Sequence, residues 1–559
     1  MLRLAVIIVG VFLPFANTSV LGREIAVATV HPLATQAGID AYKRGGNAVD
    51  AAVASALMLG VVDGHNSGIG GGCLALVRLA NGRWVALDGR ETAPQAATRD
   101  LFIRDGVAVP ALSQEGPLAV GVPGELAALD WLARRHGQRP LREALLEAAR
   151  VADDGFPVGA ELAGRLRDEA PVIRRHAEAA SIFLHPDGSP LEIGERLRQP
   201  DLARSYRAIA EKGTRWFYRG DFADRVESWM RSNDGILRKS DLARYRVVAR
   251  EPVFAGYRDC QVAGFPPPSS GGIHVAQILQ ALEGFDLRGF GAGSADLAHV
   301  TAEVMKRAFA DRAFWLGDSD HVAVPRGLTS PEYTGAWAKE IRMESATPVP
   351  GPGTPPGAWT DHFGRHTTHL SAADSEGNWV ALTATINTTL GSKVVIPGTG
   401  IPLNNEMDDF SAQPGRANYF GLVGAEANAV APGKRPLSSM SPTIVLREGR
   451  PILAVGAAGG PTIISQSVLA VIQTVDFALA PAEALAQPRI HHQWKPDEVW
   501  IETGWKSGVV DSLRDRGHQV REIRHLGAAQ AVGRVGTELQ AASDPRLDGL
   551  GAVWRDQVP

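Results

Sequence analysis

The chain has 559 residues, of which 45% are apolar and 21% are charged. This is the composition of a globular protein with a sizeable core. Its 57 basic and 61 acidic residues give a net charge of −4, so nothing favours nucleic acid as a partner, and we expect none. Cys73 and Cys260, the only cysteines, lie far apart in apolar contexts. We expect structural thiols rather than a disulfide or a catalytic cysteine.

The N-terminus carries one arginine and an apolar run over residues 4–15, followed by small and polar residues. The run is too short to span a bilayer and has the length of a signal-peptide core. A buried first helix or strand is the alternative interpretation. We expect residues 1–22 to be a signal peptide and the protein to be periplasmic or secreted.

Residues 35–60 predict two short helices separated by Gly45-Gly46. The stretch "GHNSGIGGGC" (64–73) follows a helix and lacks the G-K-[ST] ending of a phosphate loop. We therefore expect a packed turn that only glycine fits, not a nucleotide site.

The remaining elements of the first half follow from periodicity and turn residues. They are strands over 74–79 and 84–90 joined at Asn81-Gly82, a largely helical region over 120–250, a Pro-rich entry and amphipathic helix over 265–282, and a helix over about 293–313.

A Pro- and Gly-rich stretch over 344–366 forms the strongest boundary in the chain, and we expect a flexible tether there. Two predicted hairpins follow: residues 368–387 turn at 376–378, and residues 442–460 turn at 448–449. Strand pairs together with helical blocks indicate stacked sheets with helices outside.

The tether runs directly into Thr367, in "RHTTHLSAADSEGN" (365–378). A threonine hydroxyl needs a nearby base to act as a nucleophile. The residue's own α-amine, with a pKa of roughly 7.7–8, suits that task once Thr367 becomes a chain terminus. Attack of Thr367 on the carbonyl of His366 would create that terminus. Taken alone, however, a Thr-Thr pair is also ordinary strand sequence.

The whole chain from about Arg23 to about Val553 resembles the γ-glutamyltranspeptidase family of the N-terminal-nucleophile hydrolases, with its motifs in family order. The motifs that carry the resemblance are "GHNSGIGGGC" (64–73), "LDGRETAP" (87–94), "PPPSSGGIH" (266–274), "TTHLSAADSEGNWVALTATINTTLGS" (367–392), "PLNNEMDDFSAQPG" (402–415), "KRPLSSMSPTIV" (434–445), "GAAGG" (456–460) and "SDPR" (543–546).

The resemblance implies an α/β (α+β) fold, a four-layer αββα sandwich. It also implies self-cleavage between His366 and Thr367. A large subunit over 23–366 and a small catalytic subunit over 367–559 would then stay together as a heterodimer.

The family pattern also implies roles for individual residues. Thr367 matches the nucleophile, with its α-amine as general base, and Thr385 matches the threonine that hydrogen-bonds near it. Gly459 and Gly460 match the glycine pair whose N–H groups stabilise the oxyanion.

For the substrate, the pattern implies recognition of an amino-acid zwitterion. A carboxylate favours guanidinium and hydroxyl donors, and an ammonium favours carboxylate and amide acceptors. The matching positions are Arg90, Ser438 and Ser439 for the carboxylate, and Asn387, Glu406 and Asp409 for the ammonium. Glu406 and Asp409 would repel each other without a cation between them, which the substrate amine would supply.

The implied activity is cleavage of glutathione and other γ-glutamyl compounds through an ester on Thr367. The γ-glutamyl group then passes to water or to an amino-acid or dipeptide acceptor. No metal or cofactor is needed. Two alternatives remain open: a sibling acylase acting on glutaryl or cephalosporin side chains, and an unprocessed binding protein that is not an enzyme.

One position departs from the usual family pattern. Residues 410–437 match the lid loop of bacterial members, but Phe420 stands where the gate aromatic is often tyrosine, with Tyr419 beside it. Phenylalanine has no hydroxyl to hold the lid shut. We therefore expect a looser lid and more hydrolysis relative to transfer.

Overall fold

Two antiparallel sheets lie at the centre of the protein. The computed structural model describes residues 22–363 and 372–556. The first sheet has the order β20-β1-β11-β12-β2-β3-β8 and the second β19-β18-β14-β13-β10-β9. Their strands are β1 Glu24–Thr29, β2 Gly72–Arg78, β3 Trp84–Gly89, β8 Val248–Arg250, β9 Val253–Tyr257, β10 Cys260–Gly264, β11 Ala372–Asp374, β12 Trp379–Thr385, β13 Thr443–Arg447, β14 Arg450–Ala458, β18 Ala528–Val535, β19 Glu538–Ser543 and β20 Leu550–Arg555.

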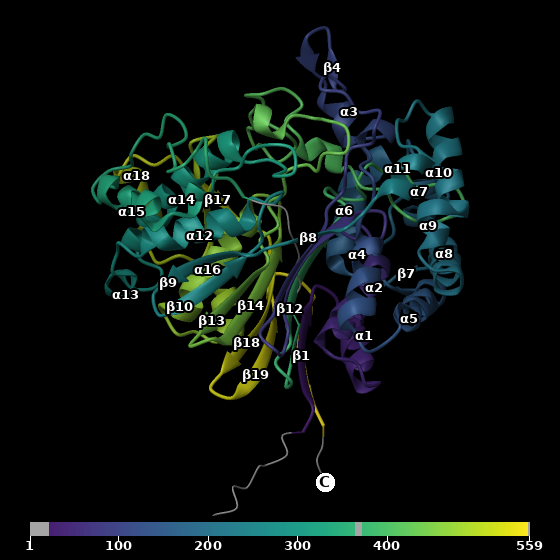
Figure 1. The fold of residues 1–559 in the computed structure, drawn as a ribbon, viewed down its shortest axis with the longest axis horizontal. Coiled ribbons are helices and arrows are strands. Elements are labelled where there is room, and N and C mark those ends of the chain that lie inside the picture. Colours follow the sequence, from purple (N-terminus) through teal and green to yellow (C-terminus); the bar gives the residue numbers. More distant parts are fainter. Residues whose placement is uncertain (1–21, 364–371, 557–559) are drawn as a thin grey trace, which may run out of the picture.

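Helices cover the outer face of each sheet (Figure 1). Against the seven-stranded sheet lie α1 Pro32–Lys43, α2 Ala48–Val62 and α4 Glu125–His136. Further out on the same side lie α5 Leu141–Asp154, α6 Ala160–Ile173, α8 Pro200–Lys212 and α10 Asp221–Ser232, with shorter helices between them. Against the six-stranded sheet lie α12 Gly271–Leu282 and α16 Thr462–Val475, and α14 Ala295–Trp315 packs on α12.

Strand β2 shows why the layers stack in this way. Every residue from Gly72 to Val77 is buried, so both faces of the strand are covered. Cys73, Ala75 and Val77 belong to the core shared with α2 and its neighbours. Leu74 and Leu76 belong to the core between the sheets. Because successive side chains of a strand alternate between its faces, one strand joins two cores. This confirms the predicted αββα sandwich.

Most local predictions for the described residues are confirmed. Helices α1 and α2 flank Gly45-Gly46, strands β2 and β3 form the first hairpin, and the two later hairpins are β11–β12 and β13–β14. The region 120–250 is largely helical. Both cysteines are buried free thiols. The short strands β1, β9, β10, β18, β19 and β20 were not predicted.

The seven-stranded sheet interleaves segments from the two halves of the chain. Strand β11 pairs with β1 on one side, with Val27 opposite Ala372, and with β12 on the other. Strand β12 in turn pairs with β2 over seven residues, from Trp379 opposite Arg78 to Thr385 opposite Gly72. The later hairpin is thus inserted between two strands of the first half.

Residues 344–363, the described part of the predicted tether, contain no helix or strand. Side chains of α14 nevertheless hold them. Glu303 accepts from the N–H of Thr347 at 3.2 Å, and Asp311 accepts from the N–H of Gly353 at 3.0 Å. Trp315 donates its indole N–H to the carbonyl of Gly353 at 3.0 Å. This stretch is therefore fixed to the helix at several points.

Two predictions fall outside the described residues. The expected signal peptide coincides with residues 1–21, and the cleavage point His366–Thr367 lies within 364–371. Within the described ranges, no helix is long and apolar enough to cross a membrane.

Trp379, fully buried between the sheets, is a test of this packing. We expect Trp379→Ala to lower the free energy of unfolding by about 3–5 kcal/mol, because it leaves a cavity that the two sheets cannot close. The measurement is the urea midpoint. Trp359, which is 75% exposed and whose ring lies 5.2 Å from that of Trp315, gives the control, and its alanine variant should lose no more than about 1.5 kcal/mol. Equal midpoints for the two variants would contradict the packing described.

Candidate active site

A buried guanidinium forms the centre of the polar site. Arg90 follows β3 directly and its side chain is 1% exposed. Its Nη1 lies 2.5 Å from a carboxylate oxygen of Glu406, and its Nη2 lies 2.5 Å from one of Asp409. Its Nε donates to the carbonyl of Pro436 at 3.2 Å. The guanidinium is therefore fixed in position by two acids and a backbone carbonyl.

The two acids come from a single 3₁₀ turn, Glu406–Asp409. Asn404 fixes the start of this turn: its side-chain oxygen accepts from the N–H groups of Glu406 and Gly121. Its amide nitrogen donates to the carbonyls of Gly70 and Gly121. All four hydrogen bonds of the amide are used, so the turn is held against the Gly-rich stretch predicted as a packed turn.

This arrangement differs from the sequence expectation in one respect. The substrate amine was expected to be the cation between Glu406 and Asp409. In the structure, Arg90 already lies between them. The repulsion of the two carboxylates is thus compensated within the chain itself.

Two further buried acids, which the sequence did not single out, lie behind this cluster. Among the described residues, neither carboxyl oxygen of Glu91 has a hydrogen-bond partner, and Arg90 Nη1 is 3.6 Å away. Burial raises the pKa of Glu91 to about 8. Burial also raises the pKa of Glu125 to about 8, and that of Glu406 well above its usual value, although Arg90 opposes the rise there. Protonation of Glu91 therefore limits the negative charge around Arg90 near neutral pH.

The hydroxyl oxygens of Ser438 and Ser439 each already accept one hydrogen bond. The N–H of Met440 donates to Ser438 Oγ at 3.1 Å, and Arg312 Nη2 donates to Ser439 Oγ at 3.0 Å. Among the described residues, neither hydroxyl donates to an acceptor. Each retains its proton for a hydrogen bond to another group.

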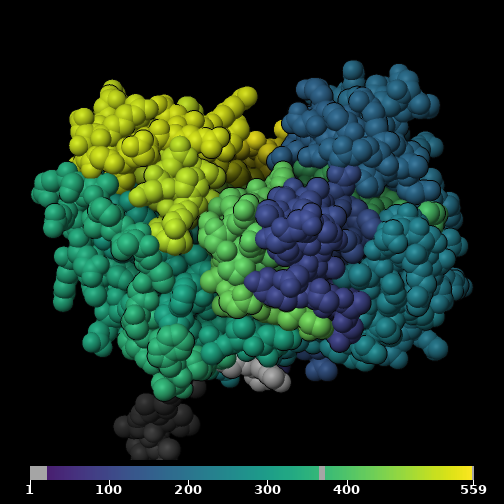
Figure 2. All heavy atoms as spheres, turned by 90° about the horizontal axis from the view of Figure 1, so that it is seen from above, coloured from purple at the N-terminus to yellow at the C-terminus, as the bar shows by residue number. Residues whose placement is uncertain are grey.

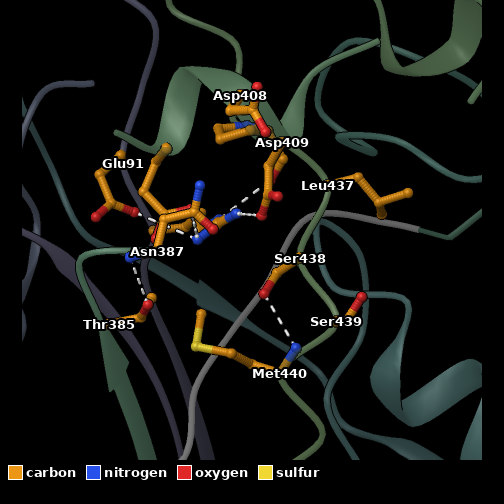
Figure 3. Close-up of polar contacts among 12 residues, drawn as sticks. Glu91, Thr385, Asn387, Asp408, Asp409, Leu437, Ser438, Ser439 and Met440 are labelled. Atoms are coloured by element: carbon orange, nitrogen blue, oxygen red, sulfur yellow. Dashed lines mark hydrogen bonds and ion pairs between the residues drawn. The ribbon is translucent and has the colours of Figure 1, made fainter. Parts of the chain in front are cut away.

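Thr385 and Asn387 lie on the other side of the site from the serines (Figure 3). Thr385 Oγ1 accepts from the N–H of Asn387 at 2.7 Å, so the threonine retains its own proton to donate. Asn387 has a positive φ of 80° and donates its amide to the carbonyl of Asn405 at 3.0 Å.

In the Gly-rich turn, a Cβ on Gly71 would lie 2.0 Å from the carbonyl oxygen of Thr385. The predicted need for glycine in this turn is confirmed.

The glycine pair lies between the end of β14 and the start of α16. Gly459 and Gly460 both have positive φ, 128° and 58°, which favours glycine. In the described part of the chain, neither N–H donates to an acceptor. Gln466 fixes the approach to the pair by donating to the carbonyl of Ala458 at 2.9 Å. The two amides are available to an oxyanion.

One cavity of about 620 Å³ brings these groups together. Its described lining includes every predicted substrate residue and three of the predicted catalytic ones: Arg90, Thr385, Asn387, Glu406, Asp409, Ser438, Ser439, Gly459 and Gly460. His366 and Thr367 are outside the described residues. Arg312 and Glu125 were missed, because no motif marks a single charged residue within a helix. Glu91 lies within the "LDGRETAP" motif, but no role was assigned to it.

The loop after the acidic turn covers the site. The phenyl ring of Phe420 lies against Gly460, where a Cβ would be 2.6 Å from its Cδ1. Arg99 forms a two-pronged ion pair with Glu426 of this loop, at 2.8 and 2.9 Å. Figure 2 shows the blue-violet segment around residues 100–115 beside the light green loop. The loop is thus anchored to the first half of the chain.

The buried carboxyl of Glu91 leads to a prediction on pH. Its pKa rises from 4.5 to about 8 on folding, so the folded state holds a proton that the unfolded state releases. The stabilisation is present at low pH and is lost as pH rises from 4.5 towards 8. Glutamine has no carboxyl group to titrate, so in Glu91→Gln this decrease in the free energy of unfolding should be absent. We therefore expect the variant to be more stable than the parent at alkaline pH.

Urea midpoints measured across that pH range test the prediction. The exposed Glu376 gives the control variant Glu376→Gln, which should follow the parent at every pH. Parallel curves for Glu91→Gln and the parent would mean that Glu91 is ionised in the folded protein.

Comparison with known proteins agrees with this geometry. The model of the gamma-glutamyltranspeptidase family matches residues 34–554. The glutathione hydrolase proenzyme of Escherichia coli (strain K12) is 43% identical over 534 residues, which cover 94% of this chain and 91% of the relative.

Two acylases are also similar. The Acylase ACY 1 proenzyme of Pseudomonas sp. (strain SE83) is 38% identical over 525 residues, covering 91% of this chain and 90% of the relative. The crystal structure of cephalosporin acylase from Bacillus halodurans superposes with a TM-score of 0.84 at 30% identity, covering 98% of this chain and all of that chain.

The family model spans nearly the whole chain, and the 43% identical relative covers almost the same extent. The chain belongs to the γ-glutamyltranspeptidase family.

Proposed function

We propose that this enzyme cleaves glutathione and other γ-glutamyl amides and transfers the γ-glutamyl group to water or to amino acids and short peptides. The observation that carries the proposal is the single cavity described above. It combines a carboxylate-binding group, ammonium acceptors and a free pair of backbone N–H groups. A γ-glutamyl donor offers one partner for each: an α-carboxylate, an α-amine and a reacting carbonyl.

Thr367 is the proposed nucleophile, with its α-amine as the base. The motif that begins at Thr367 supports this, together with the Thr385, Gly459 and Gly460 groups that line the cavity. The base removes the proton of the Thr367 hydroxyl, whose oxygen attacks the γ-carbonyl. The protonated amine then passes the proton to the leaving amine, and a γ-glutamyl ester forms.

The oxyanion formed in the attack would be stabilised by the N–H groups of Gly459 and Gly460. Removing one such donor from comparable sites costs roughly 2.7–4 kcal/mol of transition-state stabilisation. The ester is resolved by water, giving hydrolysis, or by an acceptor amine, giving transfer. None of these steps draws on a metal or cofactor.

Donor recognition is proposed to use the groups around Arg90. The α-carboxylate would bind Arg90 and the proton-bearing hydroxyls of Ser438 and Ser439. The α-ammonium would bind Glu406 and Asp409, with the side-chain oxygen of Asn387. A zwitterion carries one charge of each sign, so it enters the cluster without changing its net charge.

The acylase alternative is weaker on this geometry. A glutaryl side chain has no α-amine, so Glu406 and Asp409 would keep Arg90 as their cation but would gain no ammonium to bind on the cavity side. Two acids placed in this cavity favour a donor with an amine. A binding protein without catalysis would have no need for the free N–H pair of Gly459 and Gly460.

We further propose that the precursor cleaves itself between His366 and Thr367 and acts outside the cytoplasm. The proenzyme names of the relatives support processing into two chains. The interleaved sheet supports their staying together, because strands from 22–363 flank β11 and β12 on both sides.

Intact mass spectrometry of the purified protein tests maturation. We expect two species, the smaller starting at Thr367 and ending at Pro559. Thr367→Ala should give one uncut chain, since the alanine methyl cannot attack. A cut in Thr367→Ala, or an uncut parent, would remove Thr367 from the mechanism.

The donor is tested on the mature enzyme with a γ-glutamyl anilide and with the glutaryl anilide that lacks the amine. We expect the γ-glutamyl compound to have the higher kcat/KM by at least about tenfold, because buried acceptors left unpaired penalise the analogue. The reverse order would favour the acylase function.

Phe420, whose ring lies against Gly460, is expected to influence whether water or an acceptor amine resolves the ester. Phe420 offers no hydroxyl to fix the loop, so Phe420→Tyr should lower hydrolysis relative to transfer by a few-fold. The ratio of free glutamate to γ-glutamyl-glycylglycine formed from one donor measures this. An unchanged ratio would show that the hydroxyl at this position has no part in excluding water. Tyr419→Phe, at a neighbouring residue that is 53% exposed, is the control.

A further inference from the structure

The contacts of Arg312 extend the recognition of the donor beyond the motif residues. Arg312 lies in the last turns of α14 and is 6% exposed. Its Nε donates to Ser270 Oγ at 3.1 Å and its Nη2 donates to Ser439 Oγ at 3.0 Å. Ser270 in turn donates to the carbonyl of Ser438 at 2.9 Å. One guanidinium thus holds both residues of the serine pair, Ser439 directly and Ser438 through Ser270.

The hydrogen bond from Arg312 determines what Ser439 can do. A guanidinium can only donate, so Ser439 Oγ must accept from it. The Ser439 proton then points to some other acceptor. Of the groups that a γ-glutamyl donor brings to this cavity, only the α-carboxylate and the carbonyl oxygens can accept.

The charge of Arg312 also differs from that of Arg90. Arg90 is matched by Glu406 and Asp409 at 2.5 Å each. Arg312 forms no ion pair with any described carboxylate, and its two described side-chain partners are neutral hydroxyls. Although burial lowers its pKa to about 10, it remains a cation at neutral pH. No direct ion pair to a described carboxylate neutralises this charge, although Asp409 attracts it from a distance.

We infer that Arg312 is a positioning residue for the donor α-carboxylate. It fixes the Ser439 hydroxyl as a donor and supplies the carboxylate with a positive charge that no direct ion pair to a described residue neutralises. The inference rests on the proposed function, because it assigns this role within the same donor site. It predicts that selectivity for a free α-carboxylate depends on Arg312, whereas the chemistry at Thr367 does not.

The experiment compares a γ-glutamyl anilide with its α-methyl ester on fully cleaved enzyme. We expect Arg312→Gln to raise KM for the free acid with little change in kcat, because the contact is made equally in ground and transition states. The preference for acid over ester should fall by roughly tenfold or more, since hydrogen bonds to charged groups are the stronger ones. Arg312→Lys, which keeps the charge but cannot reach both serines with a planar fork, should fall between parent and Arg312→Gln.

Arg307 offers a matched control. It lies on the same helix and is also 6% exposed, but its partners are Glu303 and Glu340. Arg307→Gln should keep the parent's preference for the acid. A preference in Arg312→Gln equal to that in Arg307→Gln and the parent would overturn the inference.

Ser439→Ala provides a second test that does not depend on whether Arg312→Gln folds and cleaves. It should lower the preference for the acid, and an unchanged preference would also overturn the inference. In the double variant the two losses should be less than additive, because both remove the same contact. Failure of the parent to turn over either anilide would instead refute the proposed function.

Discussion

Everything else in the molecule depends on the insertion of β11 and β12 between β1 and β2. The seven residue pairs between β12 and β2 place Thr385 against the Gly-rich turn that follows α2. In the same turn, the carbonyl of Gly70 accepts a hydrogen bond from the side chain of Asn404. Asn404 in turn holds the acidic residues beside Arg90. One antiparallel pairing therefore fixes the position of Thr385 relative to the groups proposed to recognise the substrate. Because both faces of β2 are buried, a slip of one residue would exchange side chains between the two cores and disturb the packing of each.

Local chemistry made much of this fold predictable. The hairpins were marked by Glu376-Gly377-Asn378 and Glu448-Gly449, and the break between α1 and α2 by Gly45-Gly46. Strands β1 and β20 gave no such signal, because each is short and its partner lies about as far away as the chain allows. Pairing over that separation is specified by the assembled core rather than by the segment itself.

The candidate site shows the same division. Residues in motifs, such as Asp409 and Ser438, could be assigned by resemblance, and the structure places them around one cavity. Arg312 could not, because what distinguishes it is a contact with a serine 127 positions away. Glu91 lies within a motif, but only the structure shows that its carboxyl oxygens have no hydrogen-bond partner among the described residues. Contacts of this kind exist only once both sheets and their helices have assembled.

The two described ends of the chain lie together at one edge of the seven-stranded sheet (Figure 1). Glu24 faces Arg555, and the N–H of Asp556 donates to the carbonyl of Arg23 at 2.7 Å. A short linker could therefore join these ends, and a circular permutant could open the chain before Thr367 instead. The gene for such a permutant would encode a chain that begins at Thr367, and every strand would keep its neighbours. On this geometry, the two halves could form the same architecture whichever of them is translated first.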